Sequence, residues 1–325
     1  MEVLKKHVLC KCTKKFGISE GMQGILCKLG QALVFEEGSG MLEELLGLDV
    51  SAKQIQRVSE HYGGKFEDLI RSNCDAVIPK LNGKNNDPIY VMVDGSMLCT
   101  RGEQRWREMK LGRIFNGSQV VDIQENRREV TQSVYVSHLG SADEFFTKFE
   151  RYLVRYKKRI IIGDGAAWIW KWAEDNYPGA IQILDYYHAK EKLVIFSRIQ
   201  FPDEKKRKNW LDDQCKKLLE DKVDEVISEI EACRPTTEEA KQAKLKTLSY
   251  YNEHEDRMSY KTFKDQGLLI GSGPVEAAHR SVLQQRMKLS GQRWSIYGCQ
   301  AIANLRCYQK ANVWHMVKKV IAAAA

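Results

Sequence analysis

The chain has 325 residues, of which 43% are hydrophobic, enough for one large domain and a smaller accessory one. Fifty-one Lys and Arg outnumber 43 Asp and Glu, and the formal charge of +8 suits a polyanionic partner without requiring one. No apolar run approaches the roughly 18 residues of a membrane span, and residues 1–12 lack a signal-peptide core. We therefore expect a globular, cytoplasmic protein with no membrane partner.

The nine cysteines are odd in number and contain no Cys-x-x-Cys pair. This usage is typical of reduced thiols in a cytosol. Cys10 and Cys12 fit two surface thiols or the remnant of a metal knuckle.

The N-terminal part, residues 18–62, repeats apolar residues at intervals of three and four, which predicts short helices. Ser51 is placed to cap a helix over 52–62 that exposes Gln54 and Arg57. This order fits a DNA-binding helix-turn-helix, and it fits a plain helical hairpin equally well.

The hydrophobic period changes after the polar stretch 81–88. The apolar run 89–93 predicts a buried strand that ends at Asp94, and two more strands are predicted at 108–115 and 131–138. An amphipathic helix should follow Ser141.

A second apolar run, 160–162, ends at Asp164. After a helix over 166–176, the predicted strand 180–184 ends at Asp185. Strands alternating with helices predict an α/β fold, in which ligands bind at the carboxyl edge of the sheet.

The stretch from Ala189 to Lys264 is helical in pattern and highly charged, which indicates an inserted helical subdomain. We expect the following domains: a helical N-terminal domain at 1–84, a catalytic core at 85–188 and 268–315, the helical insertion at 189–267, and a tail at 316–325.

Two aspartates carry the first indication of chemistry. Asp94 and Asp164 each follow a short apolar strand beside glycine, which offers hard carboxylate oxygens on rigid strand ends with room for a phosphate. A single aspartate in this position is as well explained by a turn or a helix cap. The pair, on neighbouring parallel strands, would bridge one metal ion.

Glu276 is the best candidate for a third acid, because Pro274 favours a helix start and places Glu276 in the first turn. Complementing the helix dipole is the alternative role for Glu276. His279 and Arg280 should share its face, which suits a phosphate backbone better than a buried core.

Asp185 and His188 lie three residues apart at a junction of strand and helix, so both side chains can line the same cleft. A helix cap and an ordinary surface histidine are the plain alternatives.

Several sequence blocks carry a family resemblance. They are VDGSM (93–97), WREMKLGRIF (106–115), GDGAAWIW (163–170), PGAIQILDYYHAKEKL (178–193), GSGPVEAAHRSVLQQRMKLSGQRWS (271–295) and ANLRC (303–307). In this order they resemble the transposases of bacterial insertion sequences, most closely the IS-Kra lineage related to Mutator-like elements. The resemblance covers roughly residues 88–314.

The resemblance implies a ribonuclease H-like core, a mixed sheet flanked by helices, with an Asp, Asp, Glu triad. By position in the motifs, the triad falls on Asp94, Asp164 and Glu276. Asp185 and His188 match the Asp-x-x-His signature that follows the second catalytic aspartate. Relatives often carry a longer N-terminal region, so recognition of the element ends is the property least supported here.

The implied cofactor is a pair of Mg²⁺ or Mn²⁺ ions about 4 Å apart, bridged by Asp94 with one more ligand each from Asp164 and Glu276. Water would first free an element end, and the resulting 3′-hydroxyl would then attack target DNA.

Double-stranded DNA is the expected partner, as element ends and as target, in the nucleoid and with the protein as a homodimer or higher oligomer. Trp294 could stack on an unpaired base or pack in the core. The basic residues could follow phosphates or be solvated surface. The expected DNA contacts are Gln54, Arg57, Lys157, Lys158, Arg159, Lys205, Lys206, Arg207, Lys208, Arg280, Arg286, Lys288, Arg293 and Trp294.

Three other functions compete with transposition. A nuclease with the same core would cleave without joining ends. A domesticated DNA-binding protein would use the N-terminal helices alone. A glycosidase is disfavoured, because no sugar-binding aromatic platform lies beside Asp94.

Overall fold

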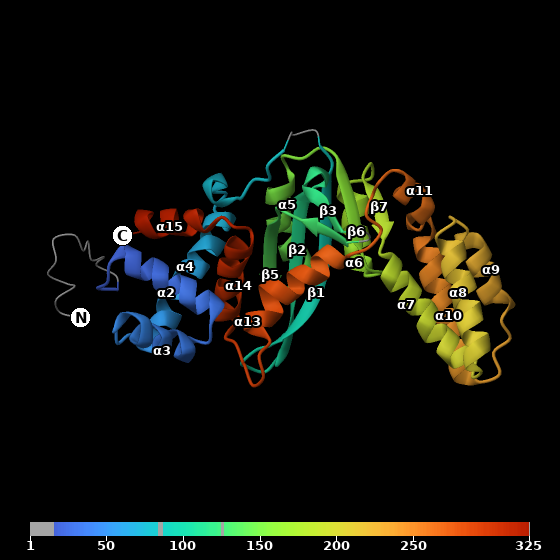
Figure 1. The fold of residues 1–325 in the computed structure, drawn as a ribbon, viewed down its shortest axis with the longest axis horizontal. Coiled ribbons are helices and arrows are strands. Elements are labelled where there is room, and N and C mark those ends of the chain that lie inside the picture. The colour runs from blue at the N-terminus through green and yellow to red at the C-terminus, as the bar shows by residue number, and fades with distance from the viewer. Residues whose placement is uncertain (1–15, 84–86, 125–126, 325) are drawn as a thin grey trace. The chain divides into compact units, whose positions relative to one another are not determined.

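The structure is a computed structural model that describes residues 16–83, 87–124 and 127–324, so Cys10 and Cys12 lie outside the described residues. Its main sheet is mixed, because β2 pairs antiparallel with β5 whereas β6 and β7 are parallel. Figure 1 shows the strands, whose order is β5 (Val134–Leu139), β2 (Trp106–Asn116), β1 (Ile89–Cys99), β6 (Arg159–Gly163) and β7 (Ile181–Leu184). The α/β class predicted from the sequence is confirmed, and β1, which contains Asp94, is the neighbour of β6, which precedes Asp164, as expected.

The chain divides into two compact units. The first comprises Met1–Ile89, Asp94–Lys157 and Val275–Ala325, and the second comprises Tyr90–Val93 and Lys158–Pro274. These units cut the chain differently from the domains predicted above, since the first unit joins residues of the expected N-terminal domain to residues of the expected core.

The helical part of the first unit is built around two helices that are distant in sequence. Its helices are α2 (Glu20–Ala32), α3 (Phe35–Leu46), α4 (Ala52–Arg71), η1 (Asp75–Val77), α14 (Ile296–Lys310) and α15 (Trp314–Ala323). As predicted, the Ser51 side chain caps α4, but α4 continues past Tyr62 because it packs against α14. A Cβ on Gly63 would clash with the Ala301 carbonyl, so the two helices meet backbone to backbone.

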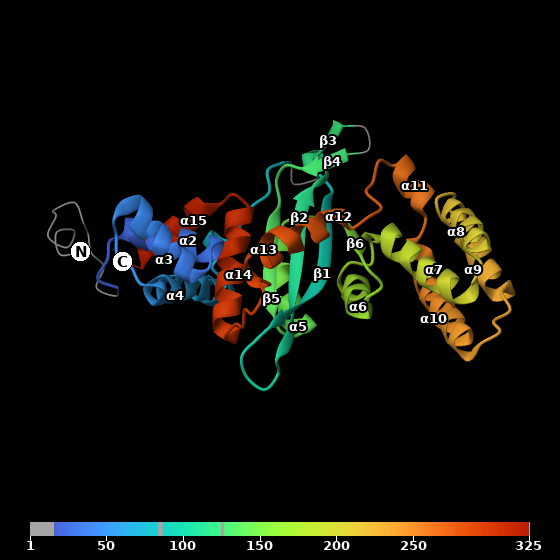
Figure 2. The same ribbon diagram turned by 60° about the horizontal axis from the view of Figure 1, so that its bottom comes forward.

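The β part of the first unit holds β2, β5 and the distal half of β1, with α5 (Ala142–Leu153) packed against β2 and β5. A small two-stranded sheet, β3 (Val120–Gln124) and β4 (Arg127–Val130), follows η2 (Gly117–Gln119) and is seen in Figure 2. The sequence did not predict this hairpin, because most residues of β3 are exposed and show no alternation. The strand predicted at 131–138 begins at Val134.

The single strong helix predicted after Pro274 is interrupted. It consists of α12 (Gly273–Ala278), the π-helical η4 (His279–Gln284) and α13 (Gln285–Met287). A π-helical turn holds more residues than an α-helical turn, so it rotates the residues that follow onto another face. Val282 and Leu283 of η4 and Met287 after it lie in the core of this unit, together with Leu98 and Trp294.

The second unit continues from the proximal half of β1 through β6, α6 (Ala167–Asn176) and β7 into a helical bundle. Its helices are α7 (Tyr186–Gln200), α8 (Glu204–Leu218), α9 (Val223–Ala232), α10 (Glu238–His254), η3 (Glu255–Arg257) and α11 (Tyr260–Asp265). α7 packs on α8 and α10, and α9 packs on the same two helices (Figure 2). The helical character predicted for residues 189–267 is confirmed.

No helix among residues 16–83, 87–124 and 127–324 is long and apolar enough to cross a bilayer.

Candidate active site

Asp94 lies inside β1 rather than at its end. The prediction that the strand stops at Asp94 is wrong, because β1 continues to Cys99 and buries Leu98 in the core of the first unit. The Asp94 side chain is 36% exposed, so it remains open to solvent and to a ligand. One carboxylate oxygen, Oδ1, accepts a hydrogen bond from the Gly95 amide at 2.6 Å.

His279 contacts the other oxygen of Asp94, with 3.3 Å between Nε2 and Oδ2. Burial and, to a smaller extent, the charge of Lys288 lower the pKa of His279 to about 4, against the opposing effects of Asp94 and Glu276. The ring is therefore neutral at physiological pH and does not cancel the charge of Asp94. The expectation that His279 shares an exposed face with Arg280 is wrong, since His279 is 3% exposed.

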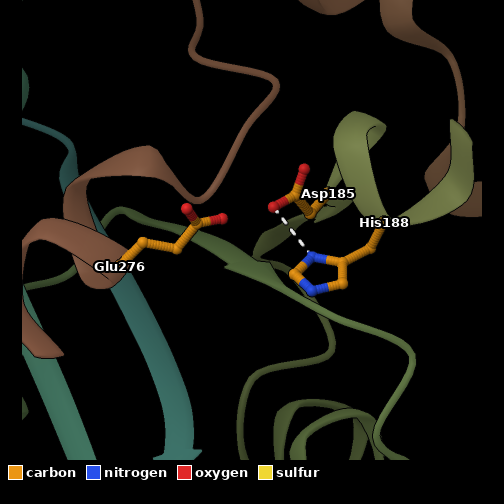
Figure 3. A group of neighbouring side chains, drawn as sticks. All are labelled: Asp185, His188 and Glu276. Atoms are coloured by element: carbon orange, nitrogen blue, oxygen red, sulfur yellow. Dashed lines mark hydrogen bonds and ion pairs between the residues drawn. The ribbon is translucent and has the colours of Figure 1, made fainter. Parts of the chain in front are cut away.

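Glu276 occupies the first turn of α12, as the sequence predicted (Figure 3), and its side chain is exposed. Its charge raises the pKa of His279, so Glu276 acts on the same ring that Asp94 contacts. Two of the three predicted acids therefore lie close to one buried histidine of the first unit.

In the second unit, Asp164 and Asp185 follow strands that are parallel and in register. Gly163 pairs with Leu184, so the next residue on each strand is an aspartate at the same sheet edge. The Asp185 amide donates to the Gly163 carbonyl at 2.8 Å. Asp164 Oδ1 accepts from the Ala166 amide at 3.0 Å, which closes the turn before α6.

Asp185 is fully buried, and hydrogen bonds use both of its oxygens. Oδ1 accepts from the Tyr187 amide at 2.6 Å. Oδ2 lies 3.1 Å from His188 Nδ1 (Figure 3). The same oxygen accepts one hydrogen bond from the Ser272 amide, at 3.0 Å, and another from the Ser272 hydroxyl. A carboxylate offers about four acceptor positions, so these four contacts leave little capacity for a metal ion. Asp185 is both the predicted cap of α7 and the residue that orients His188.

His188 is a cation in this setting. The hydrogen bond to Asp185, together with the charges of Asp185 and Asp164, raises the pKa of His188 to about 9, against the effect of burial. Its side chain is 36% exposed. A protonated imidazole cannot ligate a metal, but it can donate to a phosphate oxygen.

The sequence did not predict two further residues of this region, Tyr250 and His254 of α10. Tyr250 packs against Gly165, where any Cβ would clash with its ring, and burial together with the charges of Asp164 and Asp185 raises its pKa. Burial lowers the pKa of His254. No sequence motif near Tyr250 or His254 indicates this role, because α10 is distant from Asp164 in the sequence and contacts the Asp164 turn only in the folded protein.

Most of the expected DNA contacts are accessible. Arg57 is exposed and lies over the Phe16 ring at 5.4 Å, whereas Arg159 is partly buried on Tyr177 at 4.0 Å. Gln54 and Arg207 are also partly buried. The other expected DNA contacts with exposed side chains are Lys157, Lys158, Lys205, Lys206, Lys208, Arg280, Lys288 and Arg293.

Arg286 and Trp294 are corrections to the expected DNA contacts, because both are buried. The Arg286 guanidinium lies 4.9 Å from the Phe35 ring and 5.0 Å from the Trp294 ring, and its Nε donates to the Gly30 carbonyl. The indole of Trp294 donates to the Met287 carbonyl at 3.0 Å. Core packing, the alternative left open for Trp294, is its observed role.

Among curated proteins, none matches the chain. The model of one protein family matches residues 49–320, which include all six predicted acids and histidines of the site. The chain belongs to the uncharacterised protein family UPF0236.

Proposed function

We propose that the protein is a DNA transposase of the Asp, Asp, Glu type, which cleaves phosphodiester bonds at element ends and joins them to target DNA. The observation that carries the proposal is the register of β6 and β7, which sets Asp164 beside the Asp185–His188 pair at one sheet edge. A carboxylate next to an oriented cation can bind a metal ion and the phosphate that the ion activates.

Chain connectivity supports including Asp94 and Glu276 in the same site. Asp94 follows Val93 directly on β1, the sheet neighbour of β6, and Asp164 follows the last residue of β6. Glu276 is four residues beyond Ser272, which is bonded to Asp185. This connectivity supports the proposal that Asp94, Asp164 and Glu276 serve one site.

The donor set fits divalent metal ions. Asp94, Asp164 and Glu276 supply hard oxygen ligands, all at least partly exposed, and the neutral His279 leaves the Asp94 charge intact. Mg²⁺ or Mn²⁺ held by these residues would activate the attacking oxygen and stabilise the leaving oxygen. Asp185 holds the His188 ring in one orientation, and the imidazolium would donate to an oxygen of the bound phosphate.

The chemistry comprises two displacements. Water first forms a bond to phosphorus while the bond to the 3′-oxygen breaks, and that oxygen takes up a proton to leave a free 3′-hydroxyl. The 3′-hydroxyl then attacks a target phosphate, loses its proton, and displaces the 3′-oxygen of the target. Exposed lysines of α8 and the Lys157 turn would hold the duplex through its phosphates, in a dimer that pairs two ends.

A two-part assay tests this proposal. Purified protein should nick supercoiled plasmid with Mg²⁺ or Mn²⁺, and Asp164→Asn should lower the rate at least a hundredfold. Pre-cleaved duplexes tiled across the DNA that flanks the coding sequence should then be joined to plasmid. Cleavage without joining would favour the nuclease, and unchanged activity of Asp164→Asn would exclude this site.

A further inference from the structure

The first unit contains a pocket of about 580 Å³ beyond the distal end of β1, which we call the Trp106 pocket. Met97, Cys99, Arg105 and Trp106 line one part of it, and the segment from Met287 to Arg293 lines the rest. None of these residues belongs to the acids and histidines of the candidate active site.

Backbone hydrogen bonds hold the pocket in shape. The Trp294 amide donates to Cys99 at 3.0 Å, and the Arg101 amide donates to Trp294 at 2.7 Å, so the end of the loop pairs with the chain just after β1. The buried Trp294 ring fixes the other end of the loop, because its indole N–H donates a hydrogen bond to the Met287 carbonyl. The walls are therefore fixed by main-chain pairing rather than by surface side chains alone.

The lining combines an exposed aromatic ring with positive charge. Trp106 is 52% exposed, and Met97 and Leu289 are 46% and 40% exposed. Arg105, Lys288 and Arg293 supply three cations, and none of the described residues that line the pocket is acidic. A planar apolar surface ringed by cations complements a ligand that is flat, aromatic and anionic.

We propose that the Trp106 pocket binds one unpaired nucleotide, whose base stacks on Trp106 while Lys288 and Arg293 hold the adjoining phosphates. A base paired in a duplex buries its faces in the stack, so the ligand is single-stranded or locally unpaired DNA. Any base has a π face, so this pocket does not select a sequence.

The position of the pocket relates it to the chemistry, and on this point the inference rests on the proposed function. Met97 is three residues along β1 from Asp94, a distance of about 10 Å. Lys288 lines the pocket, and its charge also acts on His279 beside Asp94. Met97 and Asp94 point to opposite faces of β1, so the pocket is related to Asp94 through Lys288 and not through a shared strand face.

The test measures binding without catalysis. Fluorescein-labelled single-stranded oligo-dT is titrated with wild-type protein in EDTA and followed by anisotropy. Replacing the aromatic ring in Trp106→Leu should weaken binding about tenfold, whereas Trp106→Phe should remain within about threefold of wild type. Lys288→Gln should reduce the slope of the logarithm of the binding constant against the logarithm of the salt concentration by about 0.7.

A second measurement removes the base instead of the ring. A copy of the oligonucleotide that carries only abasic sites should bind wild type about tenfold more weakly, and the Trp106→Leu variant should not distinguish the two. The inference is overturned if Trp106→Leu binds oligo-dT as wild type does, or if the abasic strand binds equally well. Because Asp164→Asn should bind oligo-dT normally, failure of the catalytic proposal remains separable from failure of this one.

Discussion

Asp185 is bonded to Ser272, a residue 87 positions later in the chain, through both the amide and the hydroxyl of the serine. This contact connects the start of α7 to the turn that leads into α12. A buried carboxylate needs such donors, because burying an uncompensated charge is costly.

Ser272→Ala should therefore destabilise the protein by about 1–3 kcal/mol, the usual effect of removing one partner of a buried charged group. Urea unfolding followed by circular dichroism measures the change, with the exposed Ser290→Ala as the matched control. If both variants unfold like wild type, the hydroxyl does not support Asp185.

The Asp185–His188 pair should make stability depend on pH. The pKa of His188 is about 9 in the folded protein and near 6.5 when unfolded, so its stabilisation is complete below about pH 6.5 and is lost as the pH rises through 9. His188→Asn should therefore lower the free energy of unfolding most strongly near pH 6, and its difference from wild type should vanish by pH 10.

NMR checks the same pair directly. The His188 ring signal, assigned by its absence from His188→Asn, should titrate near pH 9. A midpoint between 6 and 7 would contradict the proposed imidazolium.

Two arginines six residues apart should behave differently. Arg286→Ala removes a buried side chain that packs on Phe35 and Trp294, and it should cost about 3 kcal/mol of stability. Arg280→Ala changes an exposed residue and should stay within about 0.5 kcal/mol of wild type. Thermal unfolding would contradict the core assignment if the two variants melted together.

Two helical glycines give a similar contrast. Gly63→Ala places a methyl group against the Ala301 carbonyl and should destabilise the contact between α4 and α14 by about 2 kcal/mol. Gly24→Ala in α2 has its nearest neighbour 4.0 Å away and should stabilise the helix by about 0.5 kcal/mol. Equal effects in urea unfolding would mean that the helices do not approach so closely.

Part of this structure could be predicted from the sequence. The apolar runs before Asp94 and Asp164 are long enough to identify buried strands, and Ser51 and Ser141 cap helices as predicted. Such signals are local, because periodicity and capping depend on residues within one or two turns.

The remaining features depend on contacts between distant segments. Arg286 was placed on the surface because an arginine in a helical pattern is usually exposed, whereas in the structure it follows the π-helical η4 and is buried. Tyr250 reaches the Asp164 turn from α10, nearly ninety residues away, so no spacing indicates it. The extension of β1 to Cys99 likewise takes place within the sheet, where β1 lies between β2 and β6.

The central claim is that Asp94, Asp164 and Glu276 converge on bound divalent cations, and iron-directed cleavage tests it most directly. Fe²⁺ replaces Mg²⁺, and ascorbate with hydrogen peroxide generates radicals that cut the protein backbone beside the metal. We predict cuts near residues 94, 164 and 276 together, suppressed by excess Mg²⁺ and absent from Asp94→Asn. Cuts confined to one of these segments, or unaffected by Mg²⁺ and by the substitution, would contradict the account.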